Sequence, residues 1–303
     1  MAEPPERRHG PIAESLGLRD APTSVEYSDV FLFQLYPYAS VHLGPEGMMG
    51  GIARDRVAGF WSALGYTPPA EPDHLAALLG LYASLAEREA GLDGAERALV
   101  REARSALMHE HLAPWTFPYL DRVRELAPPV YRAWAELLAE LLGAEMRGLA
   151  RPGFDALPIH LRSAASLPDP RVDGAAAFLE GLLAPVRSGM IVTRADLARV
   201  AADADLALRA GERRYALEHL LIQNANAVLL ALAAEATRQG RAHDLRSGWL
   251  GGSAAFLRDR CHLTATLLRE LATDGDGVEV AGRLRPEPDQ PPIRSVVRSE
   301  PLP

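Results

Sequence analysis

The sequence predicts an all-α protein. Apolar residues recur at intervals of three and four along most of the chain, and no run of strict alternation is long enough for a sheet. Apolar residues make up 48% of the 303 positions, which is ordinary for a globular protein of one large or two modest domains. A single strand stays open as an alternative within residues 25–41, which are rich in Tyr, Phe and Val.

The first half of the chain predicts a tail followed by helices. Residues 1–24 are rich in Pro, Glu and Arg and show no period, which is typical of a mobile tail. Apolar residues spaced by three and four from Leu75 to Leu85 predict a helix that has Pro72 in its first turn and stops at Gly91.

Two further helices are expected before residue 150. Asp93 and Glu96 have the spacing of a capping box, which predicts the start of a helix. Its expected inner face consists of Leu99, Ala103, Ala106 and Leu107. Pro114 and Pro118 interrupt the pattern, and a long amphipathic helix is then expected over residues 129–149.

The proline distribution divides the chain into segments. Residues 25–150 form one helical region, residues 151–170 a Pro-rich linker, residues 171–274 a second helical block and residues 275–303 a Pro-rich mobile tail. The helices of the second block are marked by Phe178, by a capping box at Thr193 and Asp196, and by apolar periods over 213–236 and 254–272.

Composition excludes several classes of function. The chain contains no Lys, which excludes a P-loop lysine and a lysine Schiff base. Its 40 acidic residues against 32 Arg give a net charge of -8, which argues against nucleic-acid binding and favours a partner with positive charge. Cys261, the single cysteine, excludes an intramolecular disulfide and fits a reducing compartment.

No export signal or membrane span is expected. Arg7 and Arg8 are followed by His, Gly and Pro instead of an apolar stretch, as in a solvated tail. The longest apolar stretch, residues 220–236, contains Gln223, Asn224 and other polar residues, and it is shorter than a span of about 20 residues. It predicts a buried helix and no membrane insertion.

The motifs of metal and nucleophilic catalysis are missing. His109 and His111 lie two residues apart, so on a helix they point to different sides and do not chelate one ion. Neither the HExxH motif nor a nucleophile elbow occurs, and no cofactor is expected. A metal-dependent hydrolase that uses His74, His111 and nearby carboxylates is kept as an alternative function.

Four short motifs resemble, in their order, those of cytoplasmic chaperones of the TorD/DmsD/NarJ type. The motif residues are Tyr27, Val30 and Phe31; Pro37 and Ser40; Glu71, Pro72, Asp73 and His74; and His111, Pro114 and Trp115. The resemblance covers residues 27–149, and Val30 stands where the family more often has Leu. It implies a helical bundle of the TorD type. Residues 171–274 either supply the helices that family members usually carry before the first motif or form an added block.

The resemblance also implies a function. Chaperones of this family bind the twin-arginine leader or N-terminus of a molybdenum-cofactor enzyme subunit until the cofactor is inserted. Such a client needs an apolar groove and carboxylates for its arginines. Glu71, Asp73 and His74 are expected to meet the arginines, and Leu112, Trp115 and Tyr119 to line the groove. The complete predicted client site is Tyr27, Phe31, Pro37, Ser40, Glu71, Asp73, His74, His111, Leu112, Pro114, Trp115 and Tyr119.

Several of these residues, and the nearby Glu46, also have a structural interpretation. Glu71 and Asp73 would favour a helix N-terminus without any client, and Trp115 would fill the core at a corner between helices. His111 would be a satisfied structural histidine, and Glu46 a solvated side chain or part of the site. A helical scaffold that joins proteins through residues 155–275, and a homodimer formed by exchange of helices across the linker, stay open as alternatives.

Overall fold

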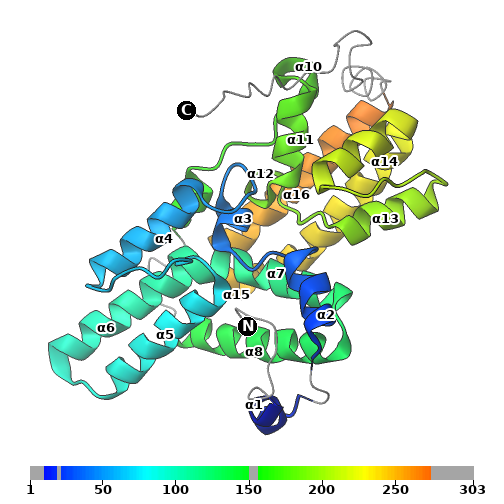
Figure 1. Ribbon diagram of the computed structural model, residues 1–303. Coiled ribbons are helices and arrows are strands. Elements are labelled where there is room, and N and C mark those ends of the chain that lie inside the picture. Colours follow the sequence, from blue (N-terminus) through cyan, green and yellow to red (C-terminus); the bar gives the residue numbers. More distant parts are fainter. Residues whose placement is uncertain (1–9, 19–21, 150–155, 274–303) are drawn as a thin grey trace, which may run out of the picture.

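The computed structural model describes residues 10–18, 22–149 and 156–273 (Figure 1). These residues contain helices and no strand, which confirms the all-α prediction. The strand considered within residues 25–41 is absent: this segment forms helical turns, and its only β-type pairing is an isolated bridge between Tyr38 and His74. Residues 1–9 and 19–21 of the expected N-terminal tail, residues 150–155, and residues 274–303, which include the expected C-terminal tail, lie outside the described part.

The first half begins with short helices and continues with five long ones. They are α1 (Gly10–Ser15), α2 (Ser24–Tyr27), the π-helix η2 (Ser28–Leu32), α3 (Ala39–Leu43), α4 (Gly51–Ala63), α5 (Leu75–Ala90), α6 (Gly94–Ala106), the π-helix η3 (Leu107–Leu112), α7 (Ala113–Leu126) and α8 (Pro129–Leu149). The helix α1 lies within the segment expected as a tail and has no buried residue.

The second half is built around one hairpin of long helices. Its elements are α9 (Ile159–Arg162), α10 (Pro170–Asp173), α11 (Ala175–Leu183), α12 (Pro185–Ser188), α13 (Arg194–Asp203), α14 (Arg213–Asp244), α15 (Ser247–Leu250) and α16 (Gly252–Thr273). The capping box at Thr193 and Asp196 is formed as predicted. The helix α14 is interrupted at Asn224, whose side chain accepts a hydrogen bond from the Ala227 N–H and restarts the helix.

Three local predictions were wrong. The helix α5 starts after Pro72, with His74 as its N-cap. Asp93 makes no side-chain capping bond, and Leu99 is 71% exposed, because α6 turns Val100 inward instead. Pro114 and Pro118 do not break the chain into separate helices: α6, η3 and α7 are continuous, with Pro114 in the first turn of α7, where no backbone N–H is needed.

The core consists of two apolar clusters that meet along a seam. One cluster joins η2 to α8 around Trp115 and Tyr131, and the other joins α11, α13, α14 and α16 around Phe178. In Figure 1 the α5–α6 hairpin, which contributes to the first cluster, and the α14–α16 hairpin, which contributes to the second, lie on opposite sides of α7. By length and composition α14 would span a membrane, but residues of its apolar face, such as Leu220 and Leu232, are fully buried in the second cluster.

Candidate functional site

The predicted client-binding residues form the inside of the first cluster. All twelve except Glu71 are buried. Trp115 stacks on His42 with ring centroids 5.0 Å apart, and its indole N–H donates to the His111 carbonyl at 2.8 Å. Leu112 and Tyr119 have no exposed surface. The structure therefore does not place them along an open groove, and it favours the interpretation of Trp115 as a core residue.

Asp73 is a backbone clamp. It is 2% exposed, and its carboxylate accepts a hydrogen bond from the Ser40 N–H at 3.0 Å, while its carbonyl accepts one from the Ala39 N–H at 2.9 Å. The Pro37 carbonyl accepts from Leu75 N–H at 2.8 Å. Two of the four motifs thus join directly, because the carboxylate and the carbonyl of Asp73 each accept from one N–H group that α3 leaves unpaired at its start.

The clamp continues into the loop that follows α3. The Ser40 hydroxyl accepts a hydrogen bond from the Gly50 N–H at 3.1 Å. Gly47 has a φ of +62°, and a Cβ there would lie 2.9 Å from Ala184 Cα, so only glycine fits. The hydrogen bond to Ser40 and the close approach of Gly47 to Ala184 hold the loop of residues 44–50 between α3 and the junction of α11 with α12.

The two motif histidines are also used internally. The Nδ1 atom of His74 accepts a hydrogen bond from the Ala76 N–H, which makes His74 the N-cap of α5. His111 Nδ1 lies 3.3 Å from Nε2 of the buried His160. No group of three metal-ligating side chains occurs within residues 10–18, 22–149 and 156–273.

These buried histidines predict acid sensitivity. Burial lowers the pKa of His42, His160 and His243 to about 4 and that of His111 to about 3. An unfolded histidine titrates near 6.5, so between that pH and about 4 the unfolded chain binds more protons than the folded one. The free energy of unfolding is expected to be constant above about pH 6.5 and to fall by about 1.4 kcal/mol per histidine for each pH unit below it. Urea unfolding from pH 7.5 to 4.5 measures this, and a constant free energy over that range contradicts it.

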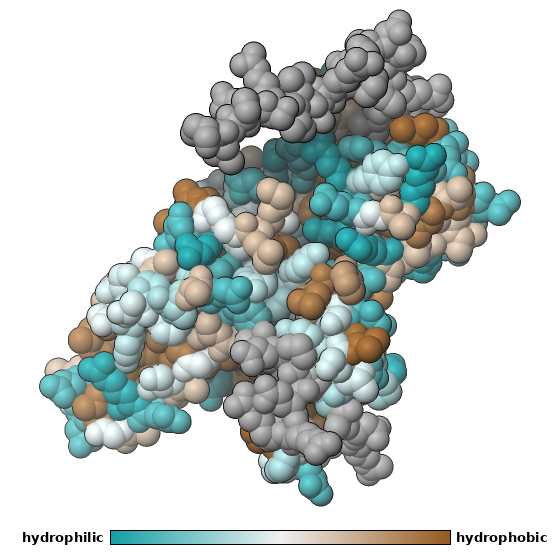
Figure 2. Space-filling model, in the orientation of Figure 1, coloured by the Kyte–Doolittle hydropathy of each residue, from teal (hydrophilic) through white to brown (hydrophobic). Residues whose placement is uncertain are grey.

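An open cleft of about 710 Å³ lies next to the clamped loop. One wall comes from the motif segments and the other from α11 to α14. Its apolar residues include Phe33, Met48 and Met49, which are 49%, 67% and 60% exposed. Figure 2 shows apolar side chains beside α2 on this face. Large exposed apolar groups in a concave site, with methionines that adapt their shape, are typical of a surface that binds a peptide.

Charged groups of both signs surround this apolar surface. The Arg214 guanidinium pairs with Glu180 at 2.7 Å, and Arg213 donates to the Val192 carbonyl at 2.8 Å. Within the described part of the chain, the side-chain carboxylates of Glu46 and Glu212 make no hydrogen bond or ion pair. Two carboxylates in the lining thus remain for a cationic partner.

Sequence reasoning missed most of this cleft. Glu46 was considered as a lining residue, whereas Phe33, Met48, Met49 and the wall formed by α13 and α14 were not. The available signal was a pair of adjacent methionines in a glycine-rich loop directly after a buried motif. Glu71 is exposed and lies outside the cleft lining. Burial of the Tyr38 side chain, together with the smaller effect of the Glu71 carboxylate, raises the pKa of Tyr38 to about 12.

Comparison with known proteins identifies the segment that carries the motifs. Residues 19–120 match the model of the nitrate reductase delta subunit family, which is a member of the TorD/NarJ group of redox-enzyme maturation chaperones. The match covers about a third of the chain and confirms the resemblance inferred from the four motifs. No curated protein and no solved structure matches the chain.

Proposed function

We propose that this chain, whose residues 19–120 match the nitrate reductase delta subunit family, is a cytoplasmic, non-enzymatic chaperone that binds the N-terminal segment of a molybdenum-cofactor enzyme subunit. The family is a chaperone for molybdoenzyme maturation and acts in the cytoplasm. Binding would protect the subunit before its cofactor is inserted or before it is exported.

One observation carries the location of the site. The family segment contributes Phe33, Met48 and Met49 to a cleft in which they are exposed, whereas its motif residues, apart from Glu71, are buried. The apolar part of the client segment would cover these three side chains. Its arginines would pair with Glu46 and Glu212, which replace Asp73 as the proposed carboxylates because Asp73 is occupied by the Ser40 N–H.

Co-expression with the catalytic subunit of a molybdoenzyme from the same cells tests this function. The tagged chain should capture the intact subunit, and capture should fall about tenfold when the subunit lacks its N-terminal segment. The captured subunit should contain no molybdenum by elemental analysis. Equal capture of both forms would place recognition outside the N-terminal segment, and capture of neither would contradict the chaperone function.

The oligomeric state is measured in the same preparation. We propose that the chaperone binds one client segment in its cleft, because the residues of one chain form this cleft without a second copy. Light scattering of the captured complex should give a mass of one chaperone and one subunit. A mass with two chaperones would favour the homodimer.

A further inference from the structure

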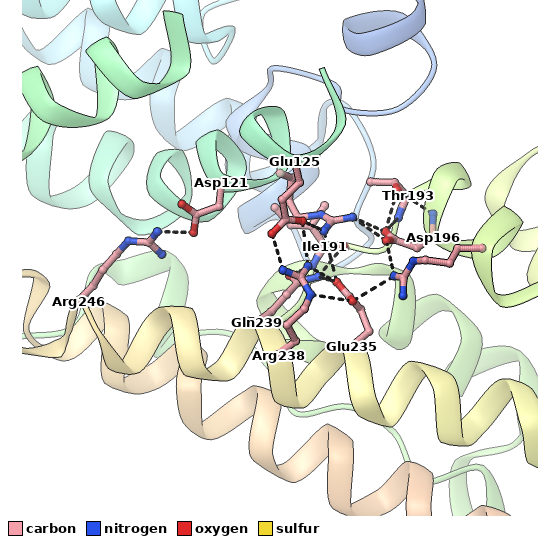
Figure 3. A network of polar contacts seen from close by, with 11 residues as sticks. Asp121, Glu125, Ile191, Thr193, Asp196, Glu235, Arg238, Gln239 and Arg246 are labelled. Carbon is pink, nitrogen blue, oxygen red and sulfur yellow. Dashed lines mark hydrogen bonds and ion pairs between the residues drawn. The ribbon is translucent and has the colours of Figure 1, made fainter. Parts of the chain in front are cut away.

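The seam between the two apolar clusters is crossed by a network of buried charges (Figure 3). Arg122 on α7 has a side chain that is 3% exposed. Its Nη2 donates to both carboxylate oxygens of Asp196 on α13, at 2.7 and 2.6 Å, and its Nη1 lies 3.4 Å from Glu235 on α14. Asp196 and Glu235 are equally buried, so one guanidinium joins three helices away from water.

Further contacts support these three residues. Arg238 Nη2 donates to Glu235 at 2.6 Å and to Glu125 on α7 at 2.9 Å, so it crosses the seam a second time. Gln239 donates to Glu235 at 2.6 Å. Burial alone would raise the pKa of Glu235, but the hydrogen bonds from Arg238 and Gln239 and the nearby guanidinium groups outweigh it and lower the pKa to about 2.

The same helices form the second wall of the cleft. Arg194, which lines the cleft, lies two residues before Asp196 in the first turn of α13, and Arg213 begins α14. The Ala195 N–H, between Arg194 and Asp196, donates at 3.0 Å to the side chain of Gln34, the residue that follows Phe33 of the first wall. The orientation of α13 and α14 on α7 therefore sets the distance between the two walls.

Buried ion pairs are suited to fixing an orientation. Their net contribution to stability is small, because desolvation of the charges offsets their attraction, whereas a planar guanidinium whose two terminal nitrogens donate to different carboxylates accepts few geometries. Apolar surfaces of similar area tolerate sliding and repacking. A seam held by charges is thus expected to define the position of the second block more strictly than an apolar seam would.

We propose that Arg122, Asp196 and Glu235 form a positioning anchor that holds α13 and α14 in one orientation on α7 and thereby fixes the width of the cleft. The anchor acts through the cleft walls and does not touch the client. The inference rests on the proposed function for its effect on client binding, but its effect on the geometry of the cleft is measurable without a client.

Spin labels on the two sides of the seam measure that geometry. Ile52 on α4 and Tyr215 on α14 are 53% and 44% exposed and lie outside the cleft lining, so Ile52→Cys and Tyr215→Cys give labelling sites. The native Cys261 is fully buried and burial raises the pKa of its thiol to about 12, so it stays unlabelled in the folded protein. Pulsed electron paramagnetic resonance then gives the distribution of distances between the labels.

The test variant replaces Arg122→Met, Asp196→Asn and Glu235→Gln together. Removing all three charges avoids leaving an unpaired buried charge, which would destabilise the protein whether or not the three residues fix the width of the cleft. The Asp196→Asn substitution keeps a side-chain oxygen that can accept the Thr193 capping bonds. The control variant, Glu89→Gln with Arg104→Met, removes a buried ion pair of 3.1 Å between α5 and α6 inside the first cluster.

Loss of the anchor is expected to change both the distance distribution between the labels and the affinity for the client peptide. The distance distribution should become about twofold wider in the triple variant and remain narrow in the control, even if both melt at lower temperature. The affinity for a fluorescent peptide, consisting of the N-terminal segment of the co-expressed catalytic subunit, should fall about tenfold in the triple variant only.

Other outcomes separate this inference from the proposed function. An unchanged distance distribution in the folded triple variant would overturn the anchor, whatever the peptide does. Equal widening in the control would also overturn it, because the effect would follow from lost stability. A wider distribution with unchanged peptide affinity would uphold the anchor and contradict the assignment of the cleft as the client site.

Discussion

Replacing Phe33 and Met49 together by aspartate is expected to weaken binding of the client's N-terminal segment by about a hundredfold. Both side chains are half-exposed in the cleft, and each is an apolar anchor of the kind whose loss at an interface costs more than about 1 kcal/mol, so that about 3 kcal/mol is expected for the two together. The substitutions also place two negative charges in the surface that the apolar part of the client would cover. Fluorescence anisotropy with a labelled N-terminal peptide of the captured subunit measures the affinity.

The fold should tolerate these two substitutions. Changes at exposed positions are usually worth less than about 0.5 kcal/mol, so the urea midpoint should be almost unchanged. A matched control is Leu99→Asp with Leu141→Asp, because these side chains are 71% and 56% exposed on α6 and α8, outside the cleft. Full affinity in the Phe33 and Met49 variant, or the same loss in the control, would place the client elsewhere.

Asp73→Arg is expected to lower the free energy of unfolding by about 3–5 kcal/mol. The carboxylate is 2% exposed and accepts the Ser40 N–H, so the substitution removes a buried acceptor and inserts a charge with no partner. Glu71→Arg, only two residues away, should change the stability by less than about 0.5 kcal/mol, because Glu71 is exposed. Urea denaturation of the two single variants measures the difference.

A conservative change at the same position separates the two roles considered for Asp73. Asp73→Asn keeps an oxygen for the Ser40 N–H, so it should cost about 1 kcal/mol, well below the cost of arginine. An Asp73→Arg variant with normal stability but without client binding would contradict the clamp. It would instead support the interpretation that this carboxylate meets the arginines of the client.

The family of the motif segment and the helical class were predictable from sequence because both depend on local patterns. The spacing of apolar residues predicts which face of a helix is buried, and the Thr193–Asp196 capping box and the stop at Gly91 involve residues close in the chain. The four motifs appear in order along the chain, so the family resemblance needed no tertiary information.

The location of the site was not predictable in the same way. Residues that recur in a family motif can contact a client or build the core, and the side-chain types alone do not separate these roles. Trp115 and Tyr119 suit an apolar groove as well as an apolar interior. Only the packing shows that they are buried and that Phe33, Met48 and Met49 are the exposed apolar residues that line the cleft.

The sequence by itself determined that this protein is helical, where most of its long helices lie and which family its motif segment matches. The tertiary structure decided what those segments contact. Asp73 meets Ser40 across 33 positions, Arg122 meets Asp196 across 74 and Glu235 across 113, and the cleft takes its walls from both halves. The physical reason is that a helical period specifies an apolar face without specifying its partner, and a charged side chain does not reveal which distant group will neutralise it.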